Sequence, residues 1–515
     1  MGALQLACRS AALLLLIFIF SLSVYRAATQ PIAHDEALEY TWFLDGGVLS
    51  ALQFNSTNHV LFTLLAKPCV KLLGVTEFTL RLPALVGAAF YLIGAYLLSS
   101  KLFGEKLLML ASVALLCLHP TTMDFMAAAR GYSLGLGFLI CGMYFAADLL
   151  GRSESDFEDK GFRRECGTVS ILLALSVTAN VTNAIPLASL TVSLFLVLRA
   201  YFNWKLSVRT FAWIFLVPGA AVGLSIFWPF LIQARPAQFA MGLHSASDSL
   251  RDIFNSSFLY KWTGDIYSVS LGALPLSPGS FLKSVSDLGV YVMLPLLFGF
   301  ISCGLVFLSR RDPPISAGRA NTLLFAGSAM GAVVLNWILH ATIQMNYPVA
   351  RTSLYLVPLF TVAAILVARE LSSSFVGGWL KIVCILIAGA VIADYTASLN
   401  TKYFRYNQYD VISRDLFRTI YADAQSRNLA NVRIGGTWWY QPEIDFYTRR
   451  YHATTIAPYD TVDRSYWWNT PNALAPEKYD YFVFTQLNDP FLSGPRIRSI
   501  FHNATFGVAV EAHEK

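Results

Sequence analysis

The chain has 515 residues, of which 55% are apolar and 14% charged, and its net charge is +6. Soluble domains carry about 25% charged residues, so this composition excludes an ordinary soluble protein and predicts a large lipid-facing surface. The excess positive charge lies in short loops between apolar segments, which excludes a nucleic-acid-binding protein.

Eleven apolar segments are long enough to be membrane helices, for which about 20 residues are needed to cross about 30 Å of hydrocarbon. They lie near residues 8–27, 80–100, 107–122, 132–150, 168–182, 185–201, 211–232, 287–309, 321–344, 352–369 and 377–396. The first is interpreted as an uncleaved helix rather than a signal peptide, because further segments follow it. The fifth and sixth are short and either cross fully or form a re-entrant pair.

The Lys and Arg residues of the loops predict the orientation. Fifteen lie in short loops on the side of the N-terminus, and ten lie in longer loops on the opposite side. This bias predicts a cytoplasmic N-terminus and an extracytoplasmic C-terminus. Short loops without targeting signals favour a bacterial inner membrane, with the C-terminal part in the periplasm.

Two domains are expected, a transmembrane domain at residues 1–396 and a periplasmic α/β domain at 397–515. The second contains 13 Lys and Arg and 12 Asp and Glu from Lys402 onward, as a water-exposed domain should. Its paired tryptophans either stack on sugars or anchor the domain at the membrane interface: Trp438, Trp439, Trp467 and Trp468. The transmembrane domain has two long outer loops, at 28–79 and 233–286.

The first outer loop contains the strongest local signal, His34, Asp35 and Glu36. Adjacent carboxylates at a membrane surface indicate a base, a cation ligand or a partner of a bound substrate. The alternative is an acidic turn that caps a short helix. Asn58 and His59 follow in an apolar part of the loop and are either structural or substrate-binding residues.

Two further outer clusters contain an arginine. Arg130 lies close to Asp124 and Tyr132, and its charge requires an anion, which is either Asp124 or a phosphate. Arg351 and Tyr355, at the outer start of the tenth segment, allow the same two interpretations. Because the predicted topology brings all of these residues to the outer surface, we expect a common cavity.

Three stretches resemble the N-terminal half of the GT-C membrane glycosyltransferases, in the branch of protein O-mannosyltransferases and lipid A aminoarabinose transferases. They are PIAHDEALEY, NHVLFTLLAKPCVKLLGVTEFTLRLPALVGAAFYLIGAYLLSSKLFG and HPTTMDFMAAARGYSLGLGFL, and together they cover roughly residues 10–150. The later stretch YPVARTSLYLVPLF resembles an Arg-aromatic-Pro helix start of the same family.

The resemblance implies transfer of one sugar from a polyprenyl-phosphate donor to a glycan, lipid or protein acceptor at the outer face. Our hypothesis for this transfer is a single displacement that inverts the anomeric centre. Asp35 matches the family's general base or cation ligand, Glu36 its partner, and Arg130 an arginine facing the donor phosphate. The chain departs from the family at residues 127–129, where an acid is usual, and at Val60, where proline is usual. Asp124 is the candidate for the missing acid.

The chemistry of this reaction agrees with these assignments. An oxocarbenium-like transition state with a departing phosphate needs a carboxylate on the acceptor side and cations on the leaving side. Asp35 would supply the first, and Arg130 and Arg351 the second. Substrate contacts are expected from His34, Asn58, His59, Asp124, Tyr132 and Tyr355, and a divalent cation, if one is required, would bind Asp35 and Asp124.

Two other classes of protein are compatible with the composition. A carrier or flippase for lipid-linked saccharides would favour internal repeats and mid-membrane charges. No convincing repeat is visible, and Glu370 and Asp394 lie at segment ends. A non-catalytic assembly subunit, whose C-terminal part binds a surface polymer, is the interpretation to prefer if Asp35 is dispensable.

Overall fold

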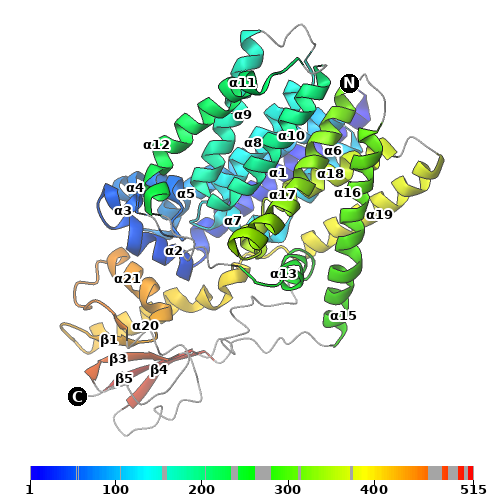
Figure 1. Ribbon diagram of the computed structural model, residues 1–515. Helices are drawn as coiled ribbons and strands as arrows, with labels where there is room; N and C mark the ends of the chain where they lie inside the picture. Colours follow the sequence, from blue (N-terminus) through cyan, green and yellow to red (C-terminus); the bar gives the residue numbers. More distant parts are fainter. Residues whose placement is uncertain are drawn as a thin grey trace.

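A computed structural model shows a bundle of long helices with a small sheet at one end of it (Figure 1). It describes residues 2–513 except 54, 56, 105, 153–158, 203–204, 234–241, 261–279, 311–314, 372–374, 462–477, 485–496 and 504–507. The N-terminus lies at the end of the bundle opposite to the sheet, and the C-terminus lies at the sheet (Figure 1).

All eleven predicted apolar segments are helical. The bundle comprises α1 (Ala3–Thr29), α5 (Glu77–Phe103), α6 (Leu107–Cys117), α7 (Pro120–Ala127), α8 (Tyr132–Leu149), α9 (Lys160–Ala179), η3 (Val181–Asn183), α10 (Ala184–Tyr201), α11 (Val208–Phe211), η4 (Ala212–Leu216), α12 (Val217–Gln233), α15 (Ser280–Leu288), η6 (Gly289–Met293), α16 (Leu294–Ser309), α17 (Ala317–Ile343), α18 (Leu356–Leu371) and α19 (Phe375–Ala397). Two connecting helices, α13 (Ala246–Phe258) and η7 (Ala350–Ser353), lie near the end that carries the sheet.

Fewer of these helices satisfy the length and hydropathy required to cross a bilayer. Within the described ranges seven do, and α6 with α7 makes an eighth if this pair, bent by 62°, counts as one span. Among the rest, α9 begins with the charged residues Lys160, Arg163 and Arg164. The 16 residues of α18 extend only about 24 Å. The chain is therefore a multi-pass helical membrane protein. Fewer of its described helices are long and apolar enough to cross a bilayer than the eleven apolar segments predicted.

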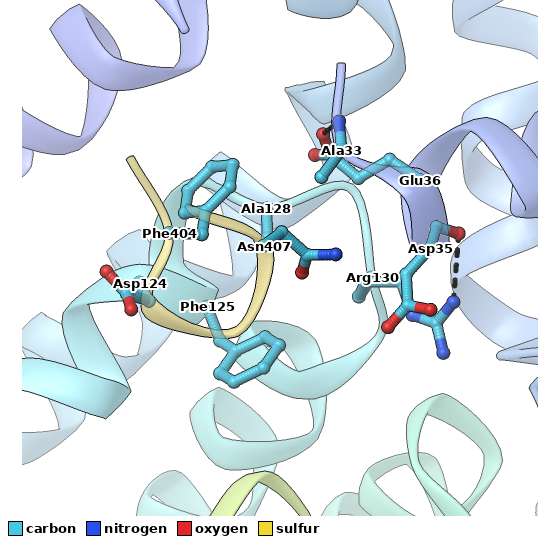
Figure 2. Close-up of a pocket in the computed structure, with 9 residues that line it drawn as sticks. All are labelled: Ala33, Asp35, Glu36, Asp124, Phe125, Ala128, Arg130, Phe404 and Asn407. Atoms are coloured by element: carbon cyan, nitrogen blue, oxygen red, sulfur yellow. Dashed lines mark hydrogen bonds between the residues drawn. The ribbon is translucent and has the colours of Figure 1, made fainter. Parts of the chain in front are cut away.

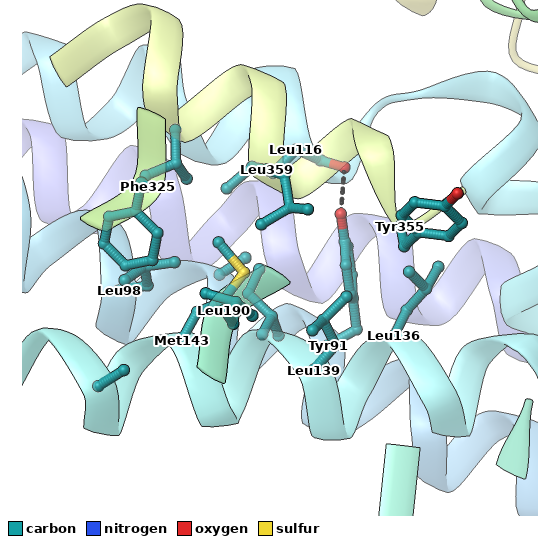
Figure 3. Close-up of a cluster of buried hydrophobic side chains, with 14 of the residues drawn as sticks. Tyr91, Leu98, Leu116, Leu136, Leu139, Met143, Leu190, Phe325, Tyr355 and Leu359 are labelled. Atoms are coloured by element: carbon teal, nitrogen blue, oxygen red, sulfur yellow. Dashed lines mark hydrogen bonds between the residues drawn. The ribbon is translucent and has the colours of Figure 1, made fainter. Parts of the chain in front are cut away.

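Close backbone contact joins the central helices α5 and α8. A Cβ atom added to Gly87 would lie 2.3 Å from the Leu134 backbone nitrogen, and one added to Gly137 would lie 2.6 Å from the Gly87 carbonyl oxygen. Large apolar side chains from α5, α8, α17 and α18 fill the space beside this contact (Figure 3). Among them, the Tyr91 hydroxyl donates to the Leu116 carbonyl oxygen at 3.0 Å. Small residues at helix contacts are typical of membrane bundles.

The first outer loop folds into α2 (His34–Glu39), the π-helix η1 (Tyr40–Leu44), α3 (Val48–Ala51) and α4 (Val60–Leu73). The Lys67 amine holds the turn between η1 and α3, because it donates to the Leu44 and Gly47 carbonyl oxygens at 3.1 and 2.7 Å. The loop is thus an ordered layer at one end of the bundle.

The C-terminal part is an α/β structure, as predicted. It contains η8 (Arg405–Ile412), α20 (Ser413–Ser426), β1 (Ile434–Gly436), η9 (Trp438–Tyr440), α21 (Gln441–Arg450), β2 (Asp460–Thr461), β3 (Tyr481–Phe484), β4 (Ile497–Asn503) and β5 (Val508–His513). The strand order is β2-β1-β3-β5-β4, with β1 parallel to both neighbours and β5 antiparallel to both of its neighbours. Trp467 and Trp468 lie outside the described residues.

The C-terminal part packs directly on the first outer loop. Ile32, Tyr40 and Phe62 of the loop share one buried apolar cluster with side chains of α20 and α21. Polar contacts converge on Glu77, the first residue of α5, which forms ion pairs with Arg414 and Arg450. The first outer loop and the C-terminal part therefore both contribute to the surface on which the candidate site lies.

Candidate functional site

Glu36 fixes the start of the helix that carries Asp35. Its Oε2 atom accepts a hydrogen bond from the Ala33 backbone nitrogen at 2.9 Å, which caps α2. Arg81 of α5 binds both of its oxygens, at 2.8 and 2.5 Å, and both side chains are buried. The Ala129 backbone nitrogen donates to Oε1 as well. Glu36 is therefore occupied by protein partners and ties α2 to α5 and to the loop before α8.

Asp35, which precedes Glu36, contacts two arginines. Its carboxylate forms an ion pair with Arg351 of η7, and its carbonyl oxygen accepts from Arg130 Nη1 at 3.0 Å. The side chain of Asp35 keeps 22% of its surface exposed. Burial alone would raise the pKa of Asp35, but the charges of Arg351, Arg130 and His34 outweigh it and hold the pKa well below its usual range.

A small pocket opens beside this carboxylate (Figure 2). Asp35 and Arg130 lie at one end of it, Asp124 and Phe404 lie at the other, and Asn407 lies between them. The lining comes from α2, α7, the loop before α8 and the segment that follows α19, and consists of Ala33, Asp35, Glu36, Asp124, Phe125, Ala128, Arg130, Phe404 and Asn407. Four of the predicted site residues line this pocket, Asp35, Glu36, Asp124 and Arg130, whereas Arg351 does not.

Asp124 has a different partner from the one considered at the sequence level. It binds Arg26 of α1 at 2.6 Å rather than Arg130, and it also accepts from the Tyr260 hydroxyl at 2.6 Å and the Arg405 backbone nitrogen at 2.9 Å. The reason is geometric, since α7 presents Asp124 toward α1 and the segment after α19. The carboxylate nearest to Arg130 is that of Glu39, at 3.8 Å.

His34 contacts the C-terminal part. Its ring stacks on Trp439 with centroids 4.7 Å apart and meets Trp438 edge to face at 5.1 Å. Its Nδ1 atom lies 2.7 Å from the Trp439 carbonyl oxygen and 3.3 Å from Glu443. Burial opposes protonation of His34, but Glu443 and Asp35 raise its pKa above the usual value. Trp438 and Trp439 therefore lie against the helix that carries Asp35.

Four other predicted residues lie behind the pocket. His59 Nδ1 donates to the Ala179 carbonyl oxygen at 3.0 Å, and its ring centroid lies 4.9 Å from that of Tyr132. The Asn58 amide donates to carbonyl oxygens of its own loop. Tyr355 is buried in the bundle, where its hydroxyl accepts from Asn336 at 2.8 Å. None of these four residues belongs to the pocket lining.

Several residues of this region were missed at the sequence level. Glu39 carries a detectable signal, because it follows Asp35 by four residues and a helix places such residues on one face. Phe404 and Asn407 carry no such signal in the sequence, since nothing in their local sequence indicates that the segment after α19 folds back over the pocket. The same is true of Arg26 and Arg81, which are ordinary arginines near the ends of apolar segments.

The two residues considered as cation ligands have protein partners. Asp35 is paired with Arg351, and Asp124 with Arg26. In the part of the chain that the structure describes, no group of three or more His, Cys, Asp and Glu side chains is arranged to hold a metal ion.

No protein-family model matches the chain, and no curated protein matches its sequence. Its structure is similar to that of ArnT from Cupriavidus metallidurans bound to undecaprenyl phosphate, with 13% identity, 97% of each chain covered and a TM-score of 0.50. ArnT in the apo state gives 11% identity, 97% of each chain and a TM-score of 0.40. The oligosaccharyltransferase AglB from Archaeoglobus fulgidus, in complex with an inhibitory peptide and dolichol-phosphate, is 12% identical in sequence. The match covers 92% of this chain and 69% of AglB, with a TM-score of 0.46.

The likeness to undecaprenyl-phosphate-bound ArnT extends over nearly the whole of both chains and concerns the fold. It confirms the GT-C fold that the resemblance of residues 10–150 predicts. The chain has a GT-C-type fold with a small C-terminal α/β part.

Proposed function

We propose that the chain is an inverting glycosyltransferase that moves one sugar from a polyprenyl-phosphate donor to a glycan, lipid or protein acceptor. The observation that carries this proposal is the partly exposed Asp35 carboxylate, which is paired with Arg351 and lies beside a pocket that Arg130 lines. Supporting it, ArnT shares this fold, and its structure was determined with undecaprenyl phosphate, a member of the proposed class of carrier.

In the proposed reaction, the acceptor hydroxyl loses its proton to Asp35 and its oxygen attacks the anomeric carbon. The bond between that carbon and the phosphate oxygen breaks, and the polyprenyl phosphate leaves with the bonding electrons. Arg130 and Arg351 would stabilise the charge that develops on the phosphate. Attack and departure on opposite faces invert the anomeric centre.

Donor binding would also activate the base. In the free protein Arg351 lowers the pKa of Asp35, which makes it a weak base. A phosphate that draws Arg351 away from Asp35 removes the largest of these lowering influences. Asp35 then gains basicity only when a donor is present.

The remaining assignments belong to the same proposal. Glu36 would position Asp35, and the neighbours of the pocket, including His34, Asp124 and Tyr132, would support the substrates. We place the protein in a bacterial inner membrane with a cytoplasmic N-terminus, a transmembrane domain at 1–396 and a periplasmic domain at 397–515. The pocket would then face the periplasm.

The test is turnover of a panel of radiolabelled polyprenyl-phosphate sugars by the protein in nanodiscs, with Asp35→Asn and Asp45→Asn beside the wild type. Asp45 is a matched control, because it lies in the same loop in an exposed ion pair with Arg449. Loss of a general base should lower turnover of the accepted donor by about 10²- to 10⁴-fold in Asp35→Asn alone. Normal turnover by well-expressed Asp35→Asn would refute the mechanism. A donor that binds the wild type without being consumed would favour a carrier or an assembly subunit.

A further inference from the structure

Glu39 lies one helical turn after Asp35 and faces Arg130, which also donates to the Asp35 carbonyl oxygen. Its Oε2 atom is 3.8 Å from Arg130 Nη1, and its side chain is fully buried. Its Oε1 atom accepts from the Thr63 hydroxyl at 2.5 Å and from the His59 backbone nitrogen at 3.4 Å. Among the described residues, Oε2 has no hydrogen-bond partner. One oxygen is thus held by α4, and the other is left to Arg130.

The surroundings of Arg130 are polar, buried and incompletely paired. Within the described ranges, the Nε atom of Arg130 has no hydrogen-bond acceptor, and the Nε2 atom of His59 has no hydrogen-bond partner. Gly131 allows these groups to approach, since an added Cβ would lie 1.9 Å from the Ala179 carbonyl oxygen and 2.8 Å from His59 Cβ. Buried polar atoms without partners are costly and indicate a role other than stability.

The two carboxyl groups on this turn of helix behave in opposite ways. Burial raises the pKa of Glu39 to about 7, and the negative charge of Asp35 adds to this effect. Arg130, the Thr63 hydroxyl and the His59 backbone nitrogen oppose it without cancelling it. Asp35 stays ionised over the same pH range because of Arg351 and Arg130. Glu39 therefore changes charge near neutral pH, with Arg130 beside it.

We propose that Glu39 is a positioning residue that determines how much of the Arg130 charge is available to the donor phosphate. This inference rests on the proposed function, because it takes Arg130 as a phosphate ligand. When Glu39 is protonated, the Arg130 guanidinium keeps its full attraction for an anion. When Glu39 is ionised, its carboxylate draws the guanidinium toward α4 and adds a negative charge close to the phosphate.

The direction of the pH effect follows from these charges. Below the pKa of Glu39 the carboxyl is neutral, and a phosphate lipid binds tightly. As the pH rises through about 7, the carboxylate forms and the lipid binds more weakly. A coupling that shifts this pKa by one unit corresponds to about a tenfold change in the dissociation constant.

The experiment measures the binding of undecaprenyl phosphate to the full chain in nanodiscs, across roughly pH 5 to 9. Wild type, Glu39→Gln and the matched control Asp45→Asn are compared. The lipid phosphate titrates in the same way with all three proteins, so only the difference between the curves reports on Glu39. We expect the dissociation constant of the wild type and of Asp45→Asn to rise about tenfold more toward high pH than that of Glu39→Gln.

A second variant keeps the inference testable if Glu39→Gln fails to fold. Thr63→Val removes the hydroxyl that stabilises the ionised form of Glu39, so the pH at which binding weakens should move upward. Coincident curves for the wild type, Glu39→Gln and Thr63→Val would overturn the role of Glu39 and leave the proposed function intact. A wild type that does not bind the lipid at any pH would overturn the proposed function itself.

Discussion

At the scale of single residues, the pairing of Asp35 with Arg351 connects donor binding to base strength. The ion pair joins residues 316 positions apart in the sequence and brings η7 against α2. An acid held by a guanidinium is ionised over a wide pH range but accepts a proton poorly. Asp35 can therefore act as an effective base only if a substrate competes for Arg351. A phosphate group is a good competitor, because it binds guanidinium groups strongly.

This competition predicts two different acid limbs in the pH profiles of the wild type. The profile of kcat/KM reports on the free protein, in which Arg351 keeps the pKa of Asp35 low, and the profile of kcat reports on the donor complex. We expect the acid limb of kcat to lie about one pH unit or more above that of kcat/KM. In Arg351→Gln, burial raises the pKa of Asp35 in the free protein, so the limb of kcat/KM should move up and the gap should close.

The matched control for this prediction is Arg449→Gln, which removes an arginine from the exposed pair with Asp45. It should keep the two limbs apart, as in the wild type. Superimposed acid limbs in the wild type would show that the donor does not take Arg351 from Asp35.

At the scale of elements, hydropathy predicted where the helices lie but not how they pack. Each apolar segment is a helix because a chain in lipid has to satisfy its backbone hydrogen bonds internally. The 62° bend between α6 and α7 has a local signal, because Pro120 begins α7 and disfavours a helical conformation of His119. The tertiary partner of the bend has none, since the Ser257 hydroxyl that lies 3.0 Å from His119 Nε2 comes from α13.

The contact between α5 and α8 gives a prediction at this scale. Gly87→Ala places a methyl group where the Leu134 backbone nitrogen is 2.3 Å away, so the two helices have to separate. Gly299→Ala is the matched control, because nothing lies within 4 Å of its added Cβ atom. Overpacking a well-packed core costs about 1 to 3 kcal/mol. Thermal unfolding in detergent should therefore occur at a lower temperature for Gly87→Ala only, and equal midpoints for both variants would contradict this packing.

At the scale of the whole molecule, the candidate site is assembled from distant parts of the chain. The sequence predicted a common cavity for Asp35, Arg130 and Arg351, because all three lie at the ends of segments on one predicted face. The contribution of the C-terminal part could not be predicted in this way. Trp439 against His34 and Asn407 in the pocket depend on how the segment after α19 folds back. The paired tryptophans were considered only as a sugar-binding surface or a membrane anchor.

The junction between the first outer loop and the C-terminal part depends on Glu77. This carboxylate is buried and receives Arg414 at 2.7 Å and the Tyr447 hydroxyl at 3.2 Å, together with the ion pair to Arg450. The Tyr447 hydroxyl also accepts from the Ile32 backbone nitrogen at 3.0 Å, two residues before His34. A loss of this junction should therefore loosen the start of α2 and, with it, Asp35.

Glu77→Gln tests this connection while keeping the size of the side chain and one of its two oxygens. Truncating a buried, hydrogen-bonded charge pair costs about 2 to 5 kcal/mol, and here two arginines lose their carboxylate. We expect faster cleavage of residues 398–515 in limited proteolysis and a lower rate of donor turnover. Asp45→Asn, which removes the exposed carboxylate paired with Arg449 of α21 across the same junction, should change neither. If Glu77→Gln is cleaved as slowly as the wild type but loses turnover, Glu77 acts on the site by a route other than docking.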